Sequence, residues 1–337
     1  MKGNFCVAES HCQAIPIYYH TLKAHHIHQR STSTLTHTHD HHHAHTSPYT
    51  LALLTRPQQE PSAIHSVQHR TSDYTLESLS AAFKEQDVVI STIAPADIPS
   101  QKWLIDAALA AGVRHFIPCE LSYDTQNPDV RDAYPPCAAR AEVLDCLREK
   151  NGQNTGFNWT ALATGCNLEN GLLEGLLAFG LQWKSATVYG AGDKKFPCST
   201  LDGVGRAVLQ ALRGLEEETS RNSYFYKAEF VTSQNELLEV LERADGKKWD
   251  MVSSEVDECI REGERRMEKG FFDGAMMLLE RNVLFGGVGD RAVWGMDRVS
   301  GEGEEKLEKV VKGMFERLER DGEADCGVCV NLLKTKK

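Results

Sequence analysis

Glycine is almost absent from the first third of this 337-residue chain. Gly3 is followed by no other glycine until Gly112. Glycine is the residue that adopts positive φ angles without strain and lets the backbone approach a bound phosphate closely. The sequence therefore excludes a glycine-rich phosphate-binding turn from residues 4–111.

The chain also lacks long apolar runs and an excess of positive charge. No window approaches the roughly 18 consecutive apolar residues of a membrane span, and no basic region followed by an apolar stretch predicts a signal peptide. Lys and Arg total 37 against 48 Asp and Glu, a net charge of −11, which argues against direct binding to nucleic acid or to an anionic membrane. Ten cysteines in a chain of this length do not form a disulfide framework, so we expect a reducing, cytoplasmic location.

Histidine, in contrast, is concentrated near the N-terminus. Eleven of the 14 histidines lie between His11 and His45. Residues 1–48 show neither a helical nor a sustained strand period, and such a tract buries too little apolar surface to offset its ordering entropy. We interpret it as a disordered or non-native low-complexity segment, with metal chelation by its imidazoles as the alternative. Its one short apolar run, Phe5–Ala8, is a candidate strand.

From Tyr49 onward, apolar runs alternate with helical patterns. The expected buried strands are Leu51–Leu54, Asp87–Ile93, Arg114–Pro118 and Trp159–Ala163, and the expected helices are Thr75–Gln86, Pro99–Ala111 and Pro135–Lys150. Strands that alternate with helices of about 10–15 residues predict an α/β fold, a parallel sheet with helices on both faces.

The second half keeps some α/β character and then becomes helical. The expected elements are a helix Leu201–Leu212 ended by Gly214, an aromatic-rich strand Asn222–Val231, a helix that opens with the capping box Ser233–Glu236 and closes at Gly246, and mostly amphipathic helix over residues 255–320. The last motif, Cys326 and Cys329, is a lone CxxC, for which coincidence is the simpler interpretation.

Motifs in several of these elements match a known family in combination. They are Asp87–Thr92, Gln101–Ala108, Ala111–Glu120, Thr50–Arg56 and Val231–Leu238. Over about residues 49–290 the chain resembles the NmrA-like or isoflavone reductase-like family of atypical short-chain dehydrogenases, which is numerous in fungi.

The resemblance implies a Rossmann-type NAD(P)-binding domain followed by a smaller, mostly helical substrate-binding portion. We place the first at residues 49–165 and the second at residues 166–325, with a tail at residues 326–337. Residues 1–48 do not match the family. Its glycine-rich opening is missing, because Phe5–Ala8 is followed by Glu9, Ser10 and His11. We therefore expect the first βα unit to be absent or degraded, and Phe5–Ala8 to fill the centre of the sheet poorly or not at all.

The resemblance also implies an NADP(H) site at the carboxyl ends of the strands. An arginine after the second strand accommodates the 2′-phosphate of NADP, and Arg56 stands in that place; a solvated loop arginine is the alternative. The candidate cofactor-binding residues are Thr55, Arg56, Ser91, Thr92, Ile93, Gln101, Pro118, Cys119 and Glu120. The candidate substrate-binding residues are Thr164, Gly165, Asn167 and Phe196.

Arg140 occupies the position of the family's catalytic lysine, on the helix that follows Pro118–Ser122. Arginine stays protonated at neutral pH, so Arg140 can hold a carboxylate or a developing oxyanion but is a poor proton shuttle. Tyr134, at the start of that helix, is a candidate proton donor, with an ordinary packed tyrosine as the alternative.

Three functions stay open at this point. The first is an NADPH-dependent reductase of a small aromatic or secondary-metabolite-like molecule. The second is a non-catalytic NAD(P)-sensing transcriptional co-regulator, which would have a regulatory protein partner and a nuclear location. The third is a cofactor-defective, truncated family member. Arg140 favours the sensor, the resemblance over Asp87–Asp124 favours the enzyme, and we assign no metal site.

Overall fold

The computed structural model describes most of the chain from Tyr49 onward, together with one N-terminal segment. The described residues are 3–8, 49–57, 68–93, 95–154, 156–216, 218–286, 288, 297–298 and 304–321. The histidine-rich tract, Glu9–His11, Cys326 and Cys329 lie outside them. The chain divides into two compact units: the first unit comprises residues 1–121, 139–162 and 201–225, and the second comprises residues 122–138, 163–200 and 226–337.

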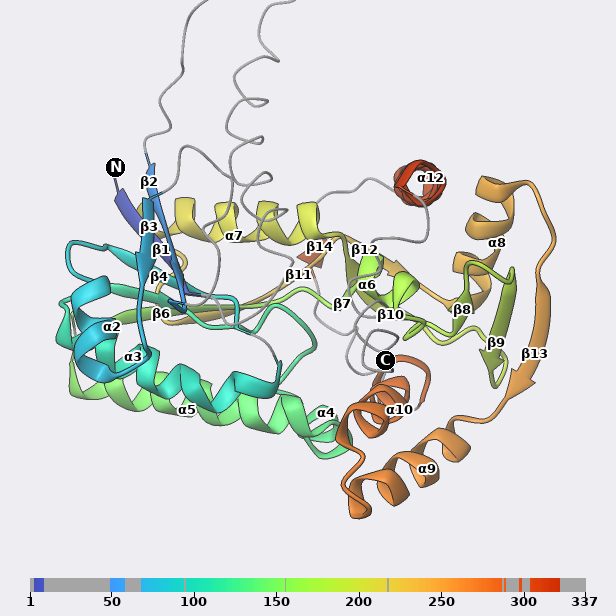
Figure 1. The fold of residues 1–337 in the computed structure, drawn as a ribbon, viewed down its shortest axis with the longest axis horizontal. Helices are drawn as coiled ribbons and strands as arrows, with labels where there is room; N and C mark the ends of the chain where they lie inside the picture. The colour runs from blue at the N-terminus through green and yellow to red at the C-terminus, as the bar shows by residue number, and fades with distance from the viewer. Residues whose placement is uncertain are drawn as a thin grey trace, which may run out of the picture. The chain divides into compact units, whose positions relative to one another are not determined.

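A parallel sheet forms the centre of the first unit (Figure 1). In spatial order its strands are β3 (Gln68–Thr71), β2 (Tyr49–Thr55), β1 (Gly3–Ala8), β4 (Val88–Ser91), β5 (His115–Ile117), β6 (Asn158–Ala163) and β11 (Ser223–Ala228). Each neighbouring pair from β3 to β6 is parallel. This order is that of the Rossmann fold, which confirms the predicted fold class. A two-residue strand, β14 (Asp297–Arg298), pairs with the end of β11.

β1 occupies the centre of the sheet, so the prediction that Phe5–Ala8 fills this place poorly or not at all is wrong. Val7 is in register with Leu53 of β2 on one side and with Ile90 of β4 on the other. The backbone N–H of Asn4 donates to Oδ2 of Asp87 at 3.0 Å, and the Asp87 N–H donates to the Asn4 carbonyl at 2.8 Å. The reason is that Phe5–Ala8 supplies apolar side chains to both faces, which is all that a central strand requires.

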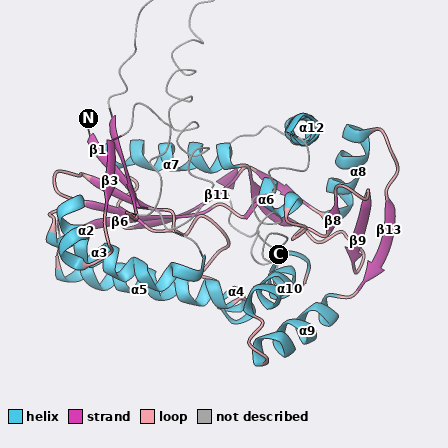
Figure 2. Cartoon of the chain, viewed as in Figure 1, coloured by secondary structure: helices cyan, strands magenta, loops and turns pink. Residues whose placement is uncertain are grey.

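Helices cover both faces of this sheet (Figure 2). On one face lie α2 (Leu76–Ala82), α3 (Gln101–Ala110), which follows the 3₁₀ helix η1 (Pro95–Ser100), and α5 (Pro135–Gln153); on the other lies α7 (Leu201–Glu216). Val89 packs in the core of the first face, with Leu104 and Leu144. Its neighbour Ile90 packs on the second face with Val208 of α7, as the alternation of a strand requires.

Local signals explain several helix ends. The Thr75 hydroxyl accepts a hydrogen bond from Ser78 N–H at the start of α2, and the capping box of Ser233 and Glu236 is formed at the start of α8. Gly246 closes α8 with a φ of 73°. The expected end at Gly214 is wrong, because α7 continues to Glu216 and Gly214 instead makes room for the side chain of Ser220.

The second unit contains two small sheets. One has the order β12 (Phe230–Thr232), β10 (Phe196–Ser199), β7 (Cys166–Asn167), and the other has the order β13 (Asp250–Ser254), β9 (Ser185–Tyr189), β8 (Phe179–Gly180). The helices are α4 (Pro128–Ala133), α6 (Leu168–Leu173), α8 (Gln234–Asp245), α9 (Val256–Glu268), α10 (Phe272–Phe285) and α12 (Glu304–Asp321). Among the described residues, no helix combines the length and apolar character needed to span a bilayer.

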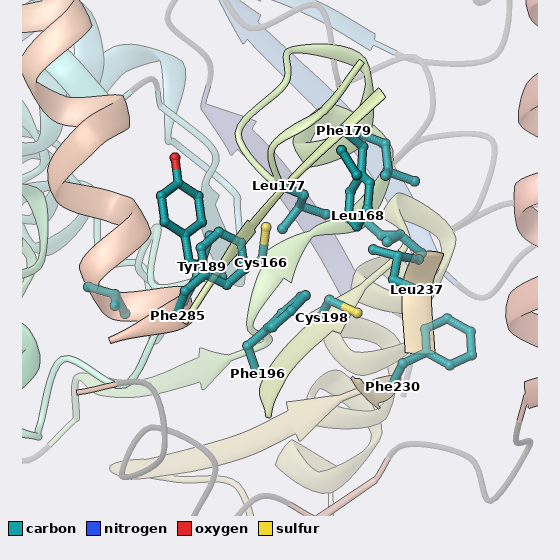
Figure 3. Close-up of a cluster of buried hydrophobic side chains, with 14 of the residues drawn as sticks. Cys166, Leu168, Leu177, Phe179, Tyr189, Phe196, Cys198, Phe230, Leu237 and Phe285 are labelled. Carbon is teal, nitrogen blue, oxygen red and sulfur yellow. The ribbon is translucent and has the colours of Figure 1, made fainter. Parts of the chain in front are cut away.

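An aromatic cluster lies in the core of this second unit (Figure 3). The ring of Tyr189 stacks on Phe285 with centroids 5.4 Å apart, and Phe196 meets Phe285 edge-on at 5.6 Å. The expected strand Asn222–Val231 is broken into β11 and β12, and its first part belongs to the first unit together with α7. The proposed division of cofactor-binding and substrate-binding portions after residue 165 stays a prediction.

Candidate functional site

The carboxyl ends of the parallel strands bring several predicted residues of the first unit to one edge of the sheet. Thr55 ends β2 and Ser91 ends β4, while Pro118 directly follows β5. Thr92 ties the end of β4 to that of β1, because its N–H donates to the Ala8 carbonyl at 3.0 Å. In open parallel sheets this edge is where ligands bind.

Arg56 is held at this edge by an aromatic ring. Its guanidinium carbon lies 4.1 Å from the centroid of Tyr74. Tyr74 is buried and has a φ of 66°, a left-handed conformation that few non-glycine residues adopt. Its N–H donates to the Ser72 hydroxyl at 3.0 Å, which helps to hold this turn. The cation–π contact thus positions a permanent positive charge at the carboxyl end of β2.

The peptide groups around Cys119 are held by two long side chains. Oε1 of Gln101 accepts a hydrogen bond from the Cys119 N–H at 2.8 Å, and Nε of Arg140 donates to the Cys119 carbonyl at 3.2 Å. The Cys119 thiol donates to the Ile93 carbonyl at 3.3 Å. The segment after β5 is therefore fixed to both α3 and α5.

Arg140 itself is buried, with 6% of its surface exposed. At least one of its nitrogens is engaged by a backbone carbonyl, and the guanidinium stays protonated. This geometry suits a residue that positions the Cys119 segment. A direct catalytic role for Arg140 stays a prediction.

Two buried polar atoms at this edge have no hydrogen-bond partner among the described residues. They are Oγ of Ser91 and Nε2 of Gln101, and both side chains have 0% exposure. A buried donor without a partner costs about 1–3 kcal/mol, and native structures keep such atoms mainly where a ligand or water completes them. This edge therefore offers a hydroxyl and an amide N–H to a polar ligand.

Glu120 and Tyr224 form a pair that the sequence indicated only in part. Glu120 was among the predicted residues, is 1% exposed, and accepts a hydrogen bond from the Tyr224 hydroxyl through Oε2 at 3.3 Å. Tyr224 lies on β11, far from Glu120 in the sequence. No local motif marks this contact, which only the order of strands in the sheet creates.

Tyr134 belongs to a second phenol–carboxylate group, in the second unit. Its hydroxyl donates to Oε2 of Glu280 at 3.0 Å, and Tyr123 donates to Oε1 of the same carboxylate at 2.8 Å. The two rings meet edge-on with centroids 6.2 Å apart. Burial raises the pKa of Tyr123 well above its ordinary value, so that phenol stays protonated. Tyr123 and Glu280 were not singled out from the sequence.

The four predicted substrate residues also lie in the second unit, and three have clear structural roles. Gly165 has a φ of 77°, and a Cβ there would collide with the Pro197 carbonyl. Asn167 caps α6, accepting from the Asn170 N–H at 2.8 Å. Phe196 is fully buried in the aromatic cluster. Thr164 differs, because its buried Oγ1 has no partner among the described residues. Their roles in substrate binding stay predictions.

Metal-binding geometry is absent from the part of the chain that the structure describes. No group of three or more His, Cys, Asp or Glu side chains there could hold a metal ion. His115, the buried histidine of the first sheet, donates through Nε2–H to the Thr160 hydroxyl oxygen at 2.8 Å, because that hydroxyl itself donates to the Ser220 carbonyl.

Comparison with known proteins assigns a family to this arrangement. The model of the NmrA-like family matches residues 59–268. Oxidoreductase aprR of Aspergillus flavus is 36% identical to this chain over 246 residues, which are 72% of this chain and 80% of that protein. The family-model match lies within residues 49–290, the range over which the sequence resembles that family.

Solved structures share the fold at low sequence identity. The binary complex of leucoanthocyanidin reductase with NADPH from Vitis vinifera has a TM-score of 0.67 and 15% identity, covering 92% of this chain and 100% of that one. AtPrR2 with NADP+ and (+)pinoresinol also has a TM-score of 0.67 and 15% identity, covering 93% and 99%. At this identity the likeness shows the fold alone.

Proposed function

Because the chain belongs to the NmrA-like family, we propose that it is an NADPH-dependent oxidoreductase that reduces a small aromatic or secondary-metabolite-like molecule. The observation that carries the proposal is the pair of buried, unpartnered polar atoms on Ser91 and Gln101 at the carboxyl edge of the sheet. A bound dinucleotide would complete them. The seven free cysteines among the described residues support a reducing, cytoplasmic location.

Arg56 supports NADPH over NADH. The 2′-phosphate of NADPH lies next to the end of the second strand in a Rossmann fold, where an acidic residue would instead select NADH. Arg56 follows β2 directly. Its contact with Tyr74 already restricts its side chain, so binding a phosphate costs less conformational entropy. Its planar, permanently charged group is suited to a phosphate.

NADPH, when bound, supplies the hydride. Arg140 and Gln101 then hold the Cys119 segment in place beside it. Reduction also needs a proton, and arginine does not release one at neutral pH. In the first unit, the hydrogen-bonded pair of Tyr224 and Glu120 is suited to this task. Tyr134, the candidate proton donor from the sequence, is bonded to Glu280 within the second unit.

The absence of glycine from the segment after β1 should weaken binding of the cofactor's diphosphate. In the sequence, β1 is followed by Glu9, Ser10 and His11, which include a carboxylate and no glycine, whereas in a Rossmann fold the backbone amides of the segment after the first strand bind the anion. We expect a version of the chain with a glycine-rich turn in place of these residues to bind NADPH more tightly. Saturation at 100 times the dissociation constant stabilises a protein by about 2.7 kcal/mol, which a thermal-shift assay resolves.

Nucleotide titration of an arginine variant tests the proposal. Arg56→Gln removes the phosphate ligand, so NADPH affinity should fall about 10- to 100-fold while NADH affinity stays unchanged. Arg148→Gln is the matched control, because Arg148 also lies over an aromatic ring, that of Trp159, but on α5. Equal losses for the two nucleotides would refute the role of Arg56, and binding of neither would refute the proposal.

The alternative function is an NAD(P)-sensing co-regulator without turnover. Arg140 favours it, because a buried arginine that donates to a backbone carbonyl replaces the family's proton-transferring lysine. Oxidation of NADPH in the presence of carbonyl and phenylpropanoid compounds distinguishes the two functions. Turnover with any of them supports the enzyme, and tight binding of NADPH without turnover supports the sensor.

A further inference from the structure

β13 is the outer strand of its sheet (Figure 1), and its first four residues are exposed. Met251 is 60% exposed and Val252 is 63% exposed. Successive residues of a strand point to opposite faces, so each face of β13 carries one exposed apolar side chain. Trp183, in the turn between β8 and β9, is 75% exposed and belongs to the same sheet.

Within the described part of the chain, no strand pairs with the outer backbone edge of β13. The Asp250 N–H donates to the Lys184 carbonyl at 2.9 Å, and the Ser254 carbonyl accepts from the Gly190 N–H at 3.0 Å. In a parallel ladder alternate residues bond to the neighbouring strand. Asp250, Val252 and Ser254 thus bond inward to β9, and Met251 and Ser253 direct their N–H and C=O groups outward.

Proteins usually protect such an edge with a lysine, a proline or a bulge in the strand. Asp250–Ser254 contains no lysine and no proline, its only charged residue is Asp250 at the first position, and its register with β9 continues without a bulge over all five residues. An unprotected edge with exposed apolar side chains is a template for another strand.

We propose that this edge pairs antiparallel with β13 of a second copy of the chain, about a two-fold axis at Val252. The charges beside the strand favour this occupant. Lys247 precedes β13, and Glu255 and Asp257 follow it, all three exposed. An antiparallel two-fold arrangement sets the basic end of one copy beside the acidic end of the other, whereas a parallel one would oppose like charges.

The backbone directions agree with this axis. Met251 faces Ser253 of the second copy, so both residues with outward N–H and C=O groups meet in hydrogen-bonded pairs. Val252, whose backbone bonds inward, then meets its own counterpart in a non-hydrogen-bonded pair, where side chains approach most closely. The two three-stranded sheets become one continuous sheet across the dimer.

Sedimentation velocity of the full chain over a dilution series tests the proposal, with a dimer of twice the 37.5 kDa chain mass as the expected species. Val252→Lys opposes two positive charges across the axis and should raise the dimer dissociation constant about tenfold or more. Met251→Pro removes an outward N–H that the subunit itself does not use and should have a similar effect. Leu76→Lys, at an apolar residue of α2 that is 54% exposed, is the control and should change nothing.

Cross-linking tests the register. In a non-hydrogen-bonded antiparallel pair the Cα atoms lie about 4.5 Å apart, within the range of a disulfide. Oxidised Val252→Cys should therefore form a covalent dimer, while Asp250→Cys, which faces Ser254 of the second copy, should not. Circular dichroism confirms that each variant is folded. A chain that is monomeric at every concentration, or a dimer that neither Val252→Lys nor Met251→Pro weakens, overturns the proposal.

Discussion

Two buried glutamines, one in each unit, occupy the same local position and do different work. Gln101 is the first residue of α3 and Gln234 the first of α8, with exposures of 0% and 1%. Gln234 is fully bonded: Oε1 accepts from the Tyr189 N–H at 2.9 Å, and Nε2 donates to the Leu177 and Thr187 carbonyls at 3.3 and 3.0 Å. It joins α8 to the strand and the loop beneath it.

Gln101 makes one side-chain hydrogen bond where Gln234 makes three. Its Oε1 accepts from the Cys119 N–H, and its Nε2 has no partner among the described residues. A glutamine at the first position of a helix therefore has all of its side-chain hydrogen bonds in the second unit. At the carboxyl edge of the first unit, the amide N–H groups of the corresponding glutamine have no partner among the described residues. In the proposed function this unpartnered donor is available to the cofactor.

The largest predicted effect on stability comes from a comparison of two glycines. It tests whether Gly165, a predicted substrate residue in the second unit, has a structural role. Gly165→Ala should lower the free energy of unfolding by about 4 kcal/mol, because the new Cβ meets the Pro197 carbonyl and φ is 77°. Gly112→Ala, with a φ of 78° but nothing within 4 Å of its Cβ, should cost only about 1–2 kcal/mol. Urea unfolding measures both. Equal losses of unfolding free energy in the two variants would show that the positive φ alone, and not the contact with Pro197, requires glycine at position 165.

The two glutamines themselves give the next largest effect. Gln234→Ala leaves three buried backbone groups without partners and should cost about 3 kcal/mol of unfolding free energy. Gln101→Ala breaks one bond and removes an unpartnered donor, so its cost should be about 1 kcal/mol, but it should weaken NADPH binding. Chemical denaturation and nucleotide titration of both variants check this. The comparison fails if Gln234→Ala weakens NADPH binding as much as Gln101→Ala does.

The stability effect predicted for His115 is smaller than those of Gly165→Ala and Gln234→Ala, and it depends on pH. Burial lowers the pKa of His115 from 6.5 to about 3 in the folded protein, with a smaller contribution from Arg221. Between these values the unfolded chain binds a proton that the folded chain does not, so the free energy of unfolding falls as the pH drops below 6.5. From pH 7 to pH 5 this loss is about 2 kcal/mol. His115→Gln should remove it, and an unchanged acid sensitivity in urea unfolding would contradict the assignment.

Patterns along the chain predicted the helices and strands of the first unit well. The apolar runs at Leu51–Leu54 and Arg114–Pro118 form strands of one parallel sheet. A strand that is buried on both faces is apolar at nearly every position, so it appears in the sequence as a short continuous apolar run. β3, with its exposed and half-buried residues Gln68–Thr71, has no such run and was missed. The run Phe5–Ala8 predicts a strand correctly but does not predict its central place between β2 and β4, because the missing glycines affect the turn after the strand and not the strand itself.

The amino-acid sequence by itself determined the class of fold, the family, and the candidate residues at strand ends, because period, caps and strand-end motifs are local properties. Only the tertiary structure decided that β1 lies between β2 and β4, that Tyr224 meets Glu120, and that Gln101 lacks the partners that Gln234 has. Hydrogen-bond satisfaction and strand order depend on residues far apart in the chain, and such contacts form only when the chain has folded.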